Sequence, residues 1–382
     1  MKPKKIYYWA PCLNKVGTVI SSLNSALAMS KYEKKQYDIY MINVFGEWNE
    51  YEKILKTNGV KIINLTFSYY NLLPKTGFIL SRFSYWIIFF VSFFPLLFLL
   101  KKKQPDFIIL HLITSLPLTL MNIFSFKTNF ILRISGYPKL NLLRKYIWKF
   151  SMKKIYKITC PTNELISELE YKQSFLKGKL AYLSDAILNF DTIKKTSNTL
   201  SDNSEKIILA AGRLTKQKNF IYLISEFKKF VNIYKNYKLI ILGDGELKSE
   251  IKMLIKEHDL ENKVDLKGRV ENVYEYMKNS EVFVLSSLWE ELGFVIVEAA
   301  FNNLYVISSD CKNGPSEFLD YGKNGIIFKS NKEGELLNAF VKFHKESDEK
   351  KFLKKILAKK MSSNYTKFRH YKILNKILSD KI

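Results

Sequence analysis

The stretch Ser286–Ala300, SSLWEELGFVIVEAA, decides how the second half of this 382-residue chain folds. The segment EVFVLSS, which ends on the first two residues of this stretch, has an apolar, partly β-branched centre, which predicts a strand. LWEELG then predicts a loop, and FVIVEAAFNN predicts a helix that begins at about Phe294. This pattern places Glu290 on the loop and Glu298 about one turn into the helix. Both carboxylates can therefore face one site at the carboxyl end of the strand.

A loop, two acids and a helix start form a set of groups suited to a phosphorylated sugar. Backbone N–H groups at a helix N-terminus have no partner in the helix and bind phosphate oxygens. Here those groups belong to Gly293, Phe294 and Val295. A glutamate accepts two hydrogen bonds from a vicinal diol such as a ribose. The alternative is that the acids only complement the helix dipole; it covers Glu290 and Glu291 but leaves Glu298 unexplained.

The remainder of the chain alternates short apolar strands with longer amphipathic stretches, which predicts parallel sheets covered on both faces. A polar segment without apolar periodicity divides the pattern. We therefore predict an α/β fold of two Rossmann-like, doubly wound domains with a ligand cleft between them. The expected boundaries are 1–189 for the first domain, 190–205 for the linker, 206–363 for the second domain, and 364–382 for a helix that returns to the first domain.

Two other predicted strand ends in the second domain carry basic residues. In AAGRLTKQKNF, Gly212 permits a sharp turn, and Arg213 and Lys218 follow on the way into a helix. An arginine that donates two parallel hydrogen bonds, a lysine ammonium and a helix N-terminus together suit a diphosphate. The alternative is that these are ordinary basic residues of a loop. In DLKGRV, Gly268 and Arg269 follow another strand, where exposed backbone groups could meet a nucleobase edge or form a plain turn.

Composition narrows the classes of partner. Lysine and arginine number 61 against 36 acids, for a formal charge of +25, yet only six residues are arginine. No nucleic-acid-binding signature is present, so we expect no nucleic-acid partner. The excess fits an anionic membrane leaflet, phosphorylated ligands or simply a solvated lysine-rich surface. Three scattered cysteines and four histidines without metal-ligand spacing predict a reducing, cytoplasmic location and no metal site.

The most apolar stretch, Phe83–Lys103, has 18 residues without charge. As a helix these would extend about 27 Å, close to the thickness of a bilayer core. Pro95 and the strand-like QPDFIILHL that follows argue against spanning. We expect a helix at the inner face of the cell membrane, with an ordinary buried helix as the alternative.

The motifs GRLTKQKN, GDGEL, LKGRV and SSLWEELGFVIVEAA resemble the retaining glycosyltransferases of family 4, which adopt the two-Rossmann-domain GT-B fold. The E-x7-E spacing from Glu290 to Glu298 is the signature of that family. The resemblance covers about Lys206–Phe328 and continues more weakly through the first domain. It departs from the family at Glu291, where glycine is usual, and at Gly17, which stands alone where a glycine pair is common.

The resemblance implies that the second domain binds a nucleotide-sugar donor and the first domain an acceptor. It also implies a role for each matching residue. Arg213 and Lys218 would neutralise the donor diphosphate, and the Gly17 amide would approach it. Glu298 would hold the ribose and Glu290 the donor sugar. The backbone around Gly268 and Arg269 would meet the base.

Two residues of the first domain are candidates for sugar or acceptor contacts. His111 ends the predicted strand FIILHL, where similar enzymes often carry a histidine that touches the sugar or acceptor; a structural hydrogen bond is the alternative. Arg133 ends the next predicted strand and would bind an acceptor phosphate, with a surface or interdomain salt bridge as the alternative.

These observations predict a retaining enzyme that moves a sugar from a nucleotide donor, with UDP favoured, to a lipid-linked or saccharide acceptor in bacterial surface polysaccharide synthesis. The predicted catalytic residues are Glu290, His111, Arg213 and Lys218. No DxD motif occurs in a suitable loop, so neither metal nor cofactor is expected. Two alternatives remain: a nucleotide-sugar epimerase of the same fold, and a non-catalytic membrane-associated protein that binds nucleotide or anionic lipid.

Overall fold

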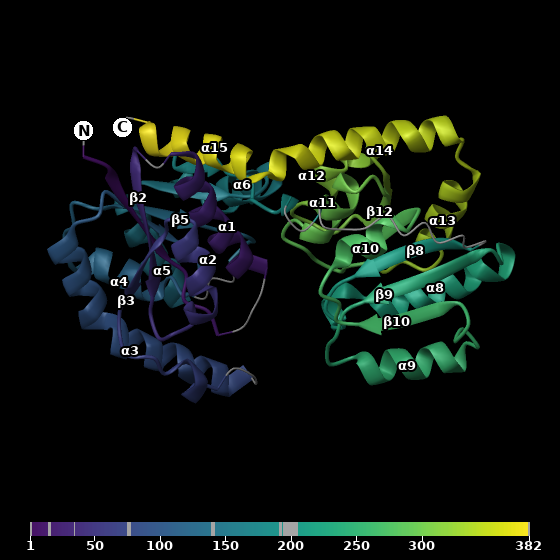
Figure 1. Cartoon of the computed structure of the whole chain (residues 1–382), viewed down its shortest axis with the longest axis horizontal. Coiled ribbons are helices and arrows are strands. Elements are labelled where there is room, and N and C mark those ends of the chain that lie inside the picture. Colours follow the sequence, from purple (N-terminus) through teal and green to yellow (C-terminus); the bar gives the residue numbers. More distant parts are fainter. Residues whose placement is uncertain are drawn as a thin grey trace. The chain divides into compact units, whose positions relative to one another are not determined.

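The chain is divided into two compact units in a computed structural model that describes residues 2–13, 17–33, 35–74, 78–138, 142–190, 193 and 205–380 (Figure 1). The first unit comprises Met1–Ala186 and Lys367–Ile382, and the second comprises Ile187–Thr366. The chain thus passes between the units at 186/187 and at 366/367. The sequence predicted these boundaries a few residues away, at 189/190 and 363/364. Most of the predicted linker, 190–205, lies outside the described residues.

The first unit contains a parallel sheet with the strand order β3-β2-β1-β4-β5-β6-β7. Its strands are β1 (Lys4–Trp9), β2 (Tyr37–Asn43), β3 (Lys61–Asn64), β4 (Phe107–Leu110), β5 (Asn129–Arg133), β6 (Lys157–Cys160) and β7 (Leu180–Tyr182). Ile6 of β1 pairs with Ile39 on one side and with Phe107 on the other. All four residues of β4 are buried, as expected for a central strand covered on both faces.

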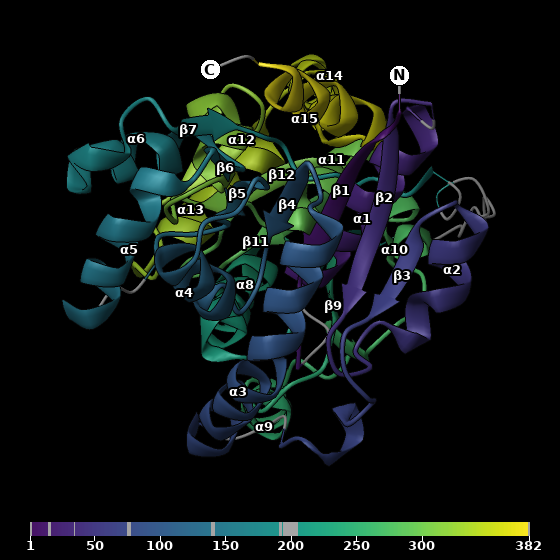
Figure 2. The ribbon, with the colours of Figure 1, turned by 90° about the vertical axis from the view of Figure 1, so that its left-hand side faces the viewer.

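Two helical layers cover this sheet (Figure 2). One layer packs α3 (Phe78–Lys103), α4 (Ser115–Ile123), α5 (Leu142–Lys154) and α6 (Asn163–Lys172) over one core. The other packs α1 (Gly17–Tyr32), α2 (Glu52–Thr57) and the C-terminal α15 (Lys367–Ser379). Helix α15 lies against α1 and buries Leu374 and Leu378 in the core of the first unit.

The second unit contains a parallel sheet with the strand order β10-β9-β8-β11-β12-β13. Its strands are β8 (Lys206–Ala211), β9 (Tyr237–Leu242), β10 (Val264–Gly268), β11 (Val282–Leu285), β12 (Tyr305–Ser309) and β13 (Ile326–Phe328). The order reverses between β8 and β11, which is the point where ligands of such sheets bind. The two doubly wound α/β units confirm the predicted fold class.

Helices also cover both faces of the second sheet. One core lies under α8 (Phe220–Ile233), α9 (Lys248–Glu257) and α13 (Glu335–Lys345). The other lies under α10 (Val273–Lys278), α11 (Phe294–Phe301), α12 (Pro315–Phe318) and α14 (Asp348–Ser362). The helix predicted to begin at about Phe294 is α11. The chain from β11 to α11 therefore has the expected strand–loop–helix order.

Candidate active site

The loops after β8 and β9 pack backbone against backbone at the carboxyl edge of the second sheet. Leu214 N–H donates to the Asp244 carbonyl at 3.0 Å. A Cβ atom on Gly243, whose φ is +144°, would lie 1.8 Å from the Gly212 carbonyl oxygen, and one on Gly245 would lie 2.5 Å from that of Leu214. The glycines of GDGEL therefore permit the close approach that fixes the loop carrying Arg213.

Lys218 and Glu290 form an ion pair in this loop cluster. Lys218 ends the short 3-10 helix Lys216–Lys218, and Glu290 follows β11. The Glu290 oxygen that accepts from the Lys218 ammonium also accepts from the Ser287 hydroxyl at 2.6 Å. Both charged side chains are largely buried, being 14% and 7% exposed. The predicted diphosphate cation and the predicted sugar acid thus hold one another in position.

Further hydrogen bonds join the two loops that carry this pair. The Ser286 hydroxyl donates to the Lys218 carbonyl at 2.8 Å. Leu288 N–H donates to the Gln217 carbonyl at 2.8 Å, and the Gln217 amide donates to the Trp289 carbonyl at 2.9 Å. The ion pair is therefore set on a rigid frame, as a charged binding group requires.

Arg213 and Arg269 present two exposed guanidinium groups on neighbouring loops. Within the described part of the chain, no hydrogen bond or ion pair engages the Arg213 side chain, so it is available to an anion. Arg269 lies near Asp244, whose pKa is lowered mainly by a hydrogen bond from Gly245 N–H, with smaller effects of Lys248 and Arg269. Gly268 ends β10 at a φ of +77°, and a Cβ there would meet no described atom within 4 Å.

Helix α11 begins immediately after the acidic loop. Gly293 precedes it in the left-handed conformation, with a φ of +76°. A Cβ on Gly314 would lie 2.4 Å from the Glu291 carbonyl oxygen, so the segment Asn313–Gly314 packs closely under this loop. Phe294 and Val295 remain partly exposed, and their amides lie in the first turn, as the sequence predicted.

Glu298 points its carboxylate toward Tyr274 of α10, whose hydroxyl donates to it at 2.8 Å. Burial raises the pKa of Glu298 to about 7, against the lowering effect of this hydrogen bond. Sequence analysis missed Tyr274, because VYEYMK carries no feature other than a helical pattern that would single it out. The structure thus adds a partner for the acid predicted to hold a ribose.

In the first unit, His111 directly follows β4 and is buried. Its backbone N–H donates to the Trp9 carbonyl at 2.9 Å, and its ring stacks on Tyr8 at 5.9 Å between centroids. Both ring nitrogens are buried without a hydrogen-bond partner among the described residues. Burial, together with the charge of Arg133, lowers the pKa of His111 well below its usual value. A neutral ring has one donor and one acceptor nitrogen, and no described residue engages either of them.

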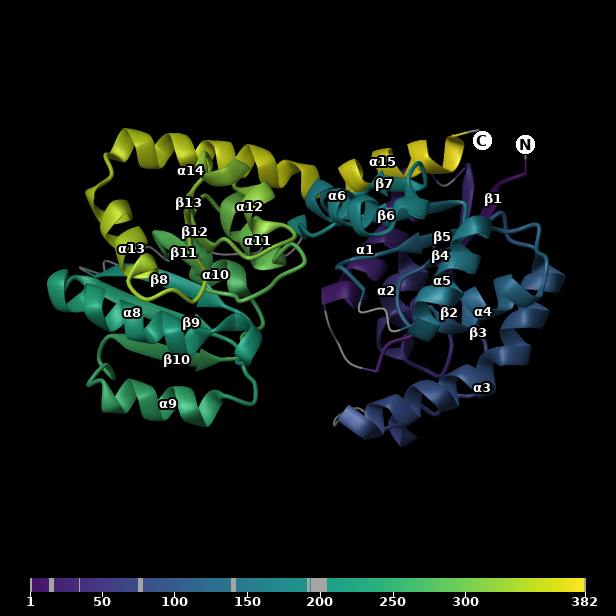
Figure 3. The same cartoon turned by 180° about the vertical axis from the view of Figure 1, so that it is seen from behind.

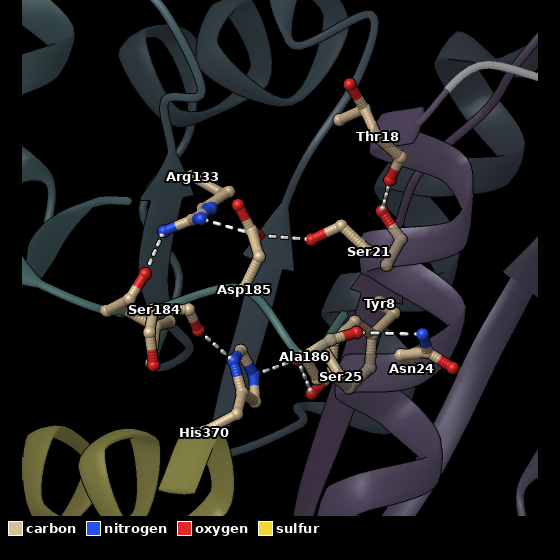
Figure 4. Close-up of polar contacts among 12 residues, drawn as sticks. Tyr8, Thr18, Ser21, Asn24, Ser25, Arg133, Ser184, Asp185, Ala186 and His370 are labelled. Carbon is tan, nitrogen blue, oxygen red and sulfur yellow. Dashed lines mark hydrogen bonds and ion pairs between the residues drawn. The ribbon is translucent and has the colours of Figure 1, made fainter. Parts of the chain in front are cut away.

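The position of Arg133 argues against its predicted role, which was to bind an acceptor phosphate. Its guanidinium is 2% exposed and donates to the Leu183 carbonyl at 2.7 Å and to Asp185 Oδ1 at 2.6 Å (Figure 4). Asp185 also accepts from the Ser21 hydroxyl of α1. Arg133 thus forms a buried ion pair within the first unit, so its charge is already matched by Asp185 and is not open to an acceptor phosphate. Gly17 begins α1, and residues 14–16 before it lie outside the described residues.

Residues 191–365, which include the Lys218–Glu290 pair and Glu298, match the family described as Glycosyl transferases group 1. These residues, which make up nearly all of the second unit, belong to this family. An uncharacterized glycosyltransferase of Methanocaldococcus jannaschii is 34% identical over 274 residues, and the match covers 62% of this chain and 66% of the relative.

Two further similarities extend over most of the chain. A Campylobacter jejuni enzyme is 29% identical over 330 residues, and the match covers 82% of this chain and 84% of the relative. It is named GalNAc-alpha-(1->4)-GalNAc-alpha-(1->3)-diNAcBac-PP-undecaprenol alpha-1,4-N-acetyl-D-galactosaminyltransferase. The Anabaena protein HepE, solved in complex with UDP, has a TM-score of 0.72 at 14% identity and covers 98% of this chain and 99% of its own. The latter similarity supports the GT-B fold.

Proposed function

We propose that this glycosyltransferase moves a sugar from a UDP-sugar to a lipid-linked saccharide, with retention of the anomeric configuration. The observation that carries the proposal is the buried Lys218–Glu290 pair beside the start of α11, with Glu298 one turn further on. These groups lie at the switch point of the second sheet, where a nucleotide is expected to bind.

Cationic and amide groups would bind the diphosphate of the donor, and nearby carboxylates would bind its hydroxyl groups. Arg213 and the first-turn amides of α11 would bind the diphosphate. Lys218 would either leave Glu290 for the diphosphate or contact both. Glu290 would accept from the sugar hydroxyls and Glu298 from the ribose diol. Assignment of uridine is supported by the UDP bound to the Anabaena protein of the same fold.

The acceptor we propose belongs to bacterial surface polysaccharide synthesis, as the name of the Campylobacter relative suggests. His111 supports a contact with the sugar or acceptor, because its two buried ring nitrogens lack described partners. Leaving a buried donor or acceptor unsatisfied costs about 1–3 kcal/mol, which a sugar hydroxyl would recover.

Charge stabilisation would drive the transfer. As the bond from the sugar to the diphosphate breaks, negative charge grows on the leaving oxygen. Arg213, Lys218 and the α11 amides would stabilise it. The leaving phosphate would assist removal of the acceptor proton on the same face, which retains the configuration. No metal takes part in this proposal, because the sequence lacks a DxD motif in a suitable loop.

Lys218→Ala and Glu298→Ala should each lower transfer from a UDP-sugar by about a hundredfold or more, since each removes a group that holds the diphosphate or the ribose. Product formation on an undecaprenyl-diphosphate saccharide measures this, and circular dichroism checks folding. Lys216→Ala is the matched control, because Lys216 is exposed on the same short helix. Full activity of either active-site variant contradicts the proposal. Isomerised sugar from donor alone would instead indicate an epimerase.

A further inference from the structure

Helix α3 presents two opposite faces, and one of them packs on the described residues of the first unit. Its buried line consists of Ser84, Ile88, Ser92, Leu96 and Leu100, spaced four residues apart. Residues 86, 90, 94 and 98 are offset from this line by two positions, which is about 200° around a helix. The second line therefore points away from the sheet.

The outward line is aromatic and exposed. Trp86, Phe90, Phe94 and Phe98 are 61%, 66%, 61% and 65% exposed, and Phe83 continues the line at 60%. Their rings contact one another along the helix: Trp86 stacks on Phe90 at 5.8 Å and Phe94 on Phe98 at 6.3 Å between centroids. Contiguous exposed apolar surface of this kind marks a binding face. We call these five residues the aromatic stripe.

The charge around the stripe indicates what covers it. Between Phe78 and Lys154 the sequence has twelve basic residues and one acid, Asp106. Of the twelve, Arg133 is buried in its ion pair, whereas Lys101, Lys102 and Lys103 lie exposed at the end of α3. A protein partner would normally be matched by mixed charges, whereas this almost purely cationic segment complements an anionic surface.

Helix α5 extends this chemistry. Helix α4 lies between α3 and α5 and packs against both (Figure 3). On α5, Lys145, Lys149 and Lys153 are exposed at four-residue spacing beside exposed Tyr146 and Phe150. Lysines alternating with aromatic rings on a helix surface are typical of segments that lie at the boundary of lipid headgroups and acyl chains.

The position of α3 in the sheet decides between lying on a membrane and crossing it. By length and composition α3 is the one helix among the described residues that could span a bilayer. Of its apolar 18-residue segment, 28% is buried in the protein. It connects β3 to β4, however, and both strands belong to the same sheet. Tyr69 and Leu73 before the helix also pack in the same core as Ile108 after it. Both ends of α3 would thus remain on the same side of a membrane.

From these observations we propose that the aromatic stripe of α3 docks on an anionic bilayer surface, with its rings in the headgroup region and the lysines of α3 and α5 on anionic lipids. This surface is independent of the proposed sugar transfer, because none of its residues belongs to the active site. It would place the first unit against the membrane in which a lipid-linked acceptor resides.

Tryptophan fluorescence offers a direct test. Trp86 lies on the stripe, Trp289 is comparably exposed at 53% in the second unit, and Trp9, Trp48 and Trp148 are buried. Vesicles of phosphatidylcholine and phosphatidylglycerol with brominated acyl chains should quench the full-length protein. Trp86→Phe should remove most of this quenching, and Trp289→Phe should retain it. Equal loss in both variants, or no quenching, overturns the proposal.

Cosedimentation with the same vesicles tests the stripe and the charge separately. Phe90→Ser/Phe94→Ser should weaken binding about tenfold or more. Phe352→Ser/Ile356→Ser, which alters exposed apolar residues of α14 in the second unit, should leave binding unchanged. Lys102→Gln/Lys103→Gln should weaken binding to anionic vesicles about 25-fold, because each lysine contributes about 1 kcal/mol, and Lys350→Gln/Lys360→Gln should not.

Two other outcomes would overturn the proposal in defined ways. Sedimentation of a lipid-free dimer that Phe90→Ser/Phe94→Ser dissociates would show that a second copy covers the stripe. Resistance to carbonate extraction from membranes would show that α3 spans. Release by carbonate and by high salt is the expected result, since the electrostatic part of the binding is screened within about 10 Å at 0.1 M salt.

Discussion

Glu298 shows at the scale of one residue how burial sets chemistry. Its carboxyl is buried and receives a single described hydrogen bond, from Tyr274. Desolvation disfavours the charged form and raises its pKa to about 7. A proton on this carboxyl would remove one acceptor position from the proposed ribose contact.

UDP affinity should therefore depend on pH through Glu298. The ionised carboxylate predominates above pH 7, so affinity should be greatest there and fall by up to tenfold per unit below it. Calorimetry with UDP at pH 6, 7 and 8 measures this. Glu298→Gln is the control, because it keeps the titration of the nucleotide phosphate; the same pH profile in that variant contradicts the prediction.

Tyr274→Phe should shift this profile to higher pH. The tyrosine hydroxyl stabilises the charged form of Glu298, so its removal raises the pKa of the carboxyl further. At pH 7 we expect UDP binding to weaken severalfold and to recover toward pH 8.5. Weakening of the same size at every pH would show that Tyr274 only supports the local fold.

At the scale of elements, the close packing of the loops after β8 and β9 depends on Gly243. Gly243→Ala would place its Cβ 1.8 Å from the Gly212 carbonyl oxygen in a left-handed region. We expect this to lower the free energy of unfolding of the second unit by about 3 kcal/mol or more. In Gly334→Ala, φ is +77° but no described atom lies within 4 Å, so about 1 kcal/mol is expected. Urea denaturation of both variants makes the comparison; equal losses would contradict it.

At the scale of the molecule, the chain crosses between its units twice, and a polar network anchors both crossings to the first unit. His370 of α15 hydrogen-bonds the Ser184 carbonyl at 2.5 Å and the Ser25 hydroxyl at 2.7 Å (Figure 4). Asn24 donates to the Ala186 carbonyl at 2.8 Å. The C-terminal helix is thus an integral part of the first unit, although the second unit separates it in sequence.

Leu374→Ala should accordingly destabilise the first unit by about 2–5 kcal/mol and leave the second unchanged, because Leu374 is fully buried in the first core. Leu336→Ala, at a fully buried position of the second unit, should do the reverse. Hydrogen exchange followed by peptide resolves the two units. Loss of protection in the second unit with Leu374→Ala would contradict this assignment.

Local sequence patterns determined the two sheets, the strand–loop–helix order around Glu290 and the family. Strand periodicity, glycine at strand ends and the E-x7-E spacing are all carried by neighbouring residues, so no long-range contact is needed to detect them. The same information placed Arg213 and Lys218 after the carboxyl end of one strand and Glu298 in the helix that follows another.

Only the tertiary structure decided which groups pair and which faces are covered. Lys218 meets Glu290, and Arg133 meets Asp185, across 72 and 52 residues, separations that no local pattern encodes. Helix α3 is apolar all round, so its sequence has no period that distinguishes a buried side from a lipid-facing one. The sheet resolves this, because packing of one face leaves the aromatic stripe outside.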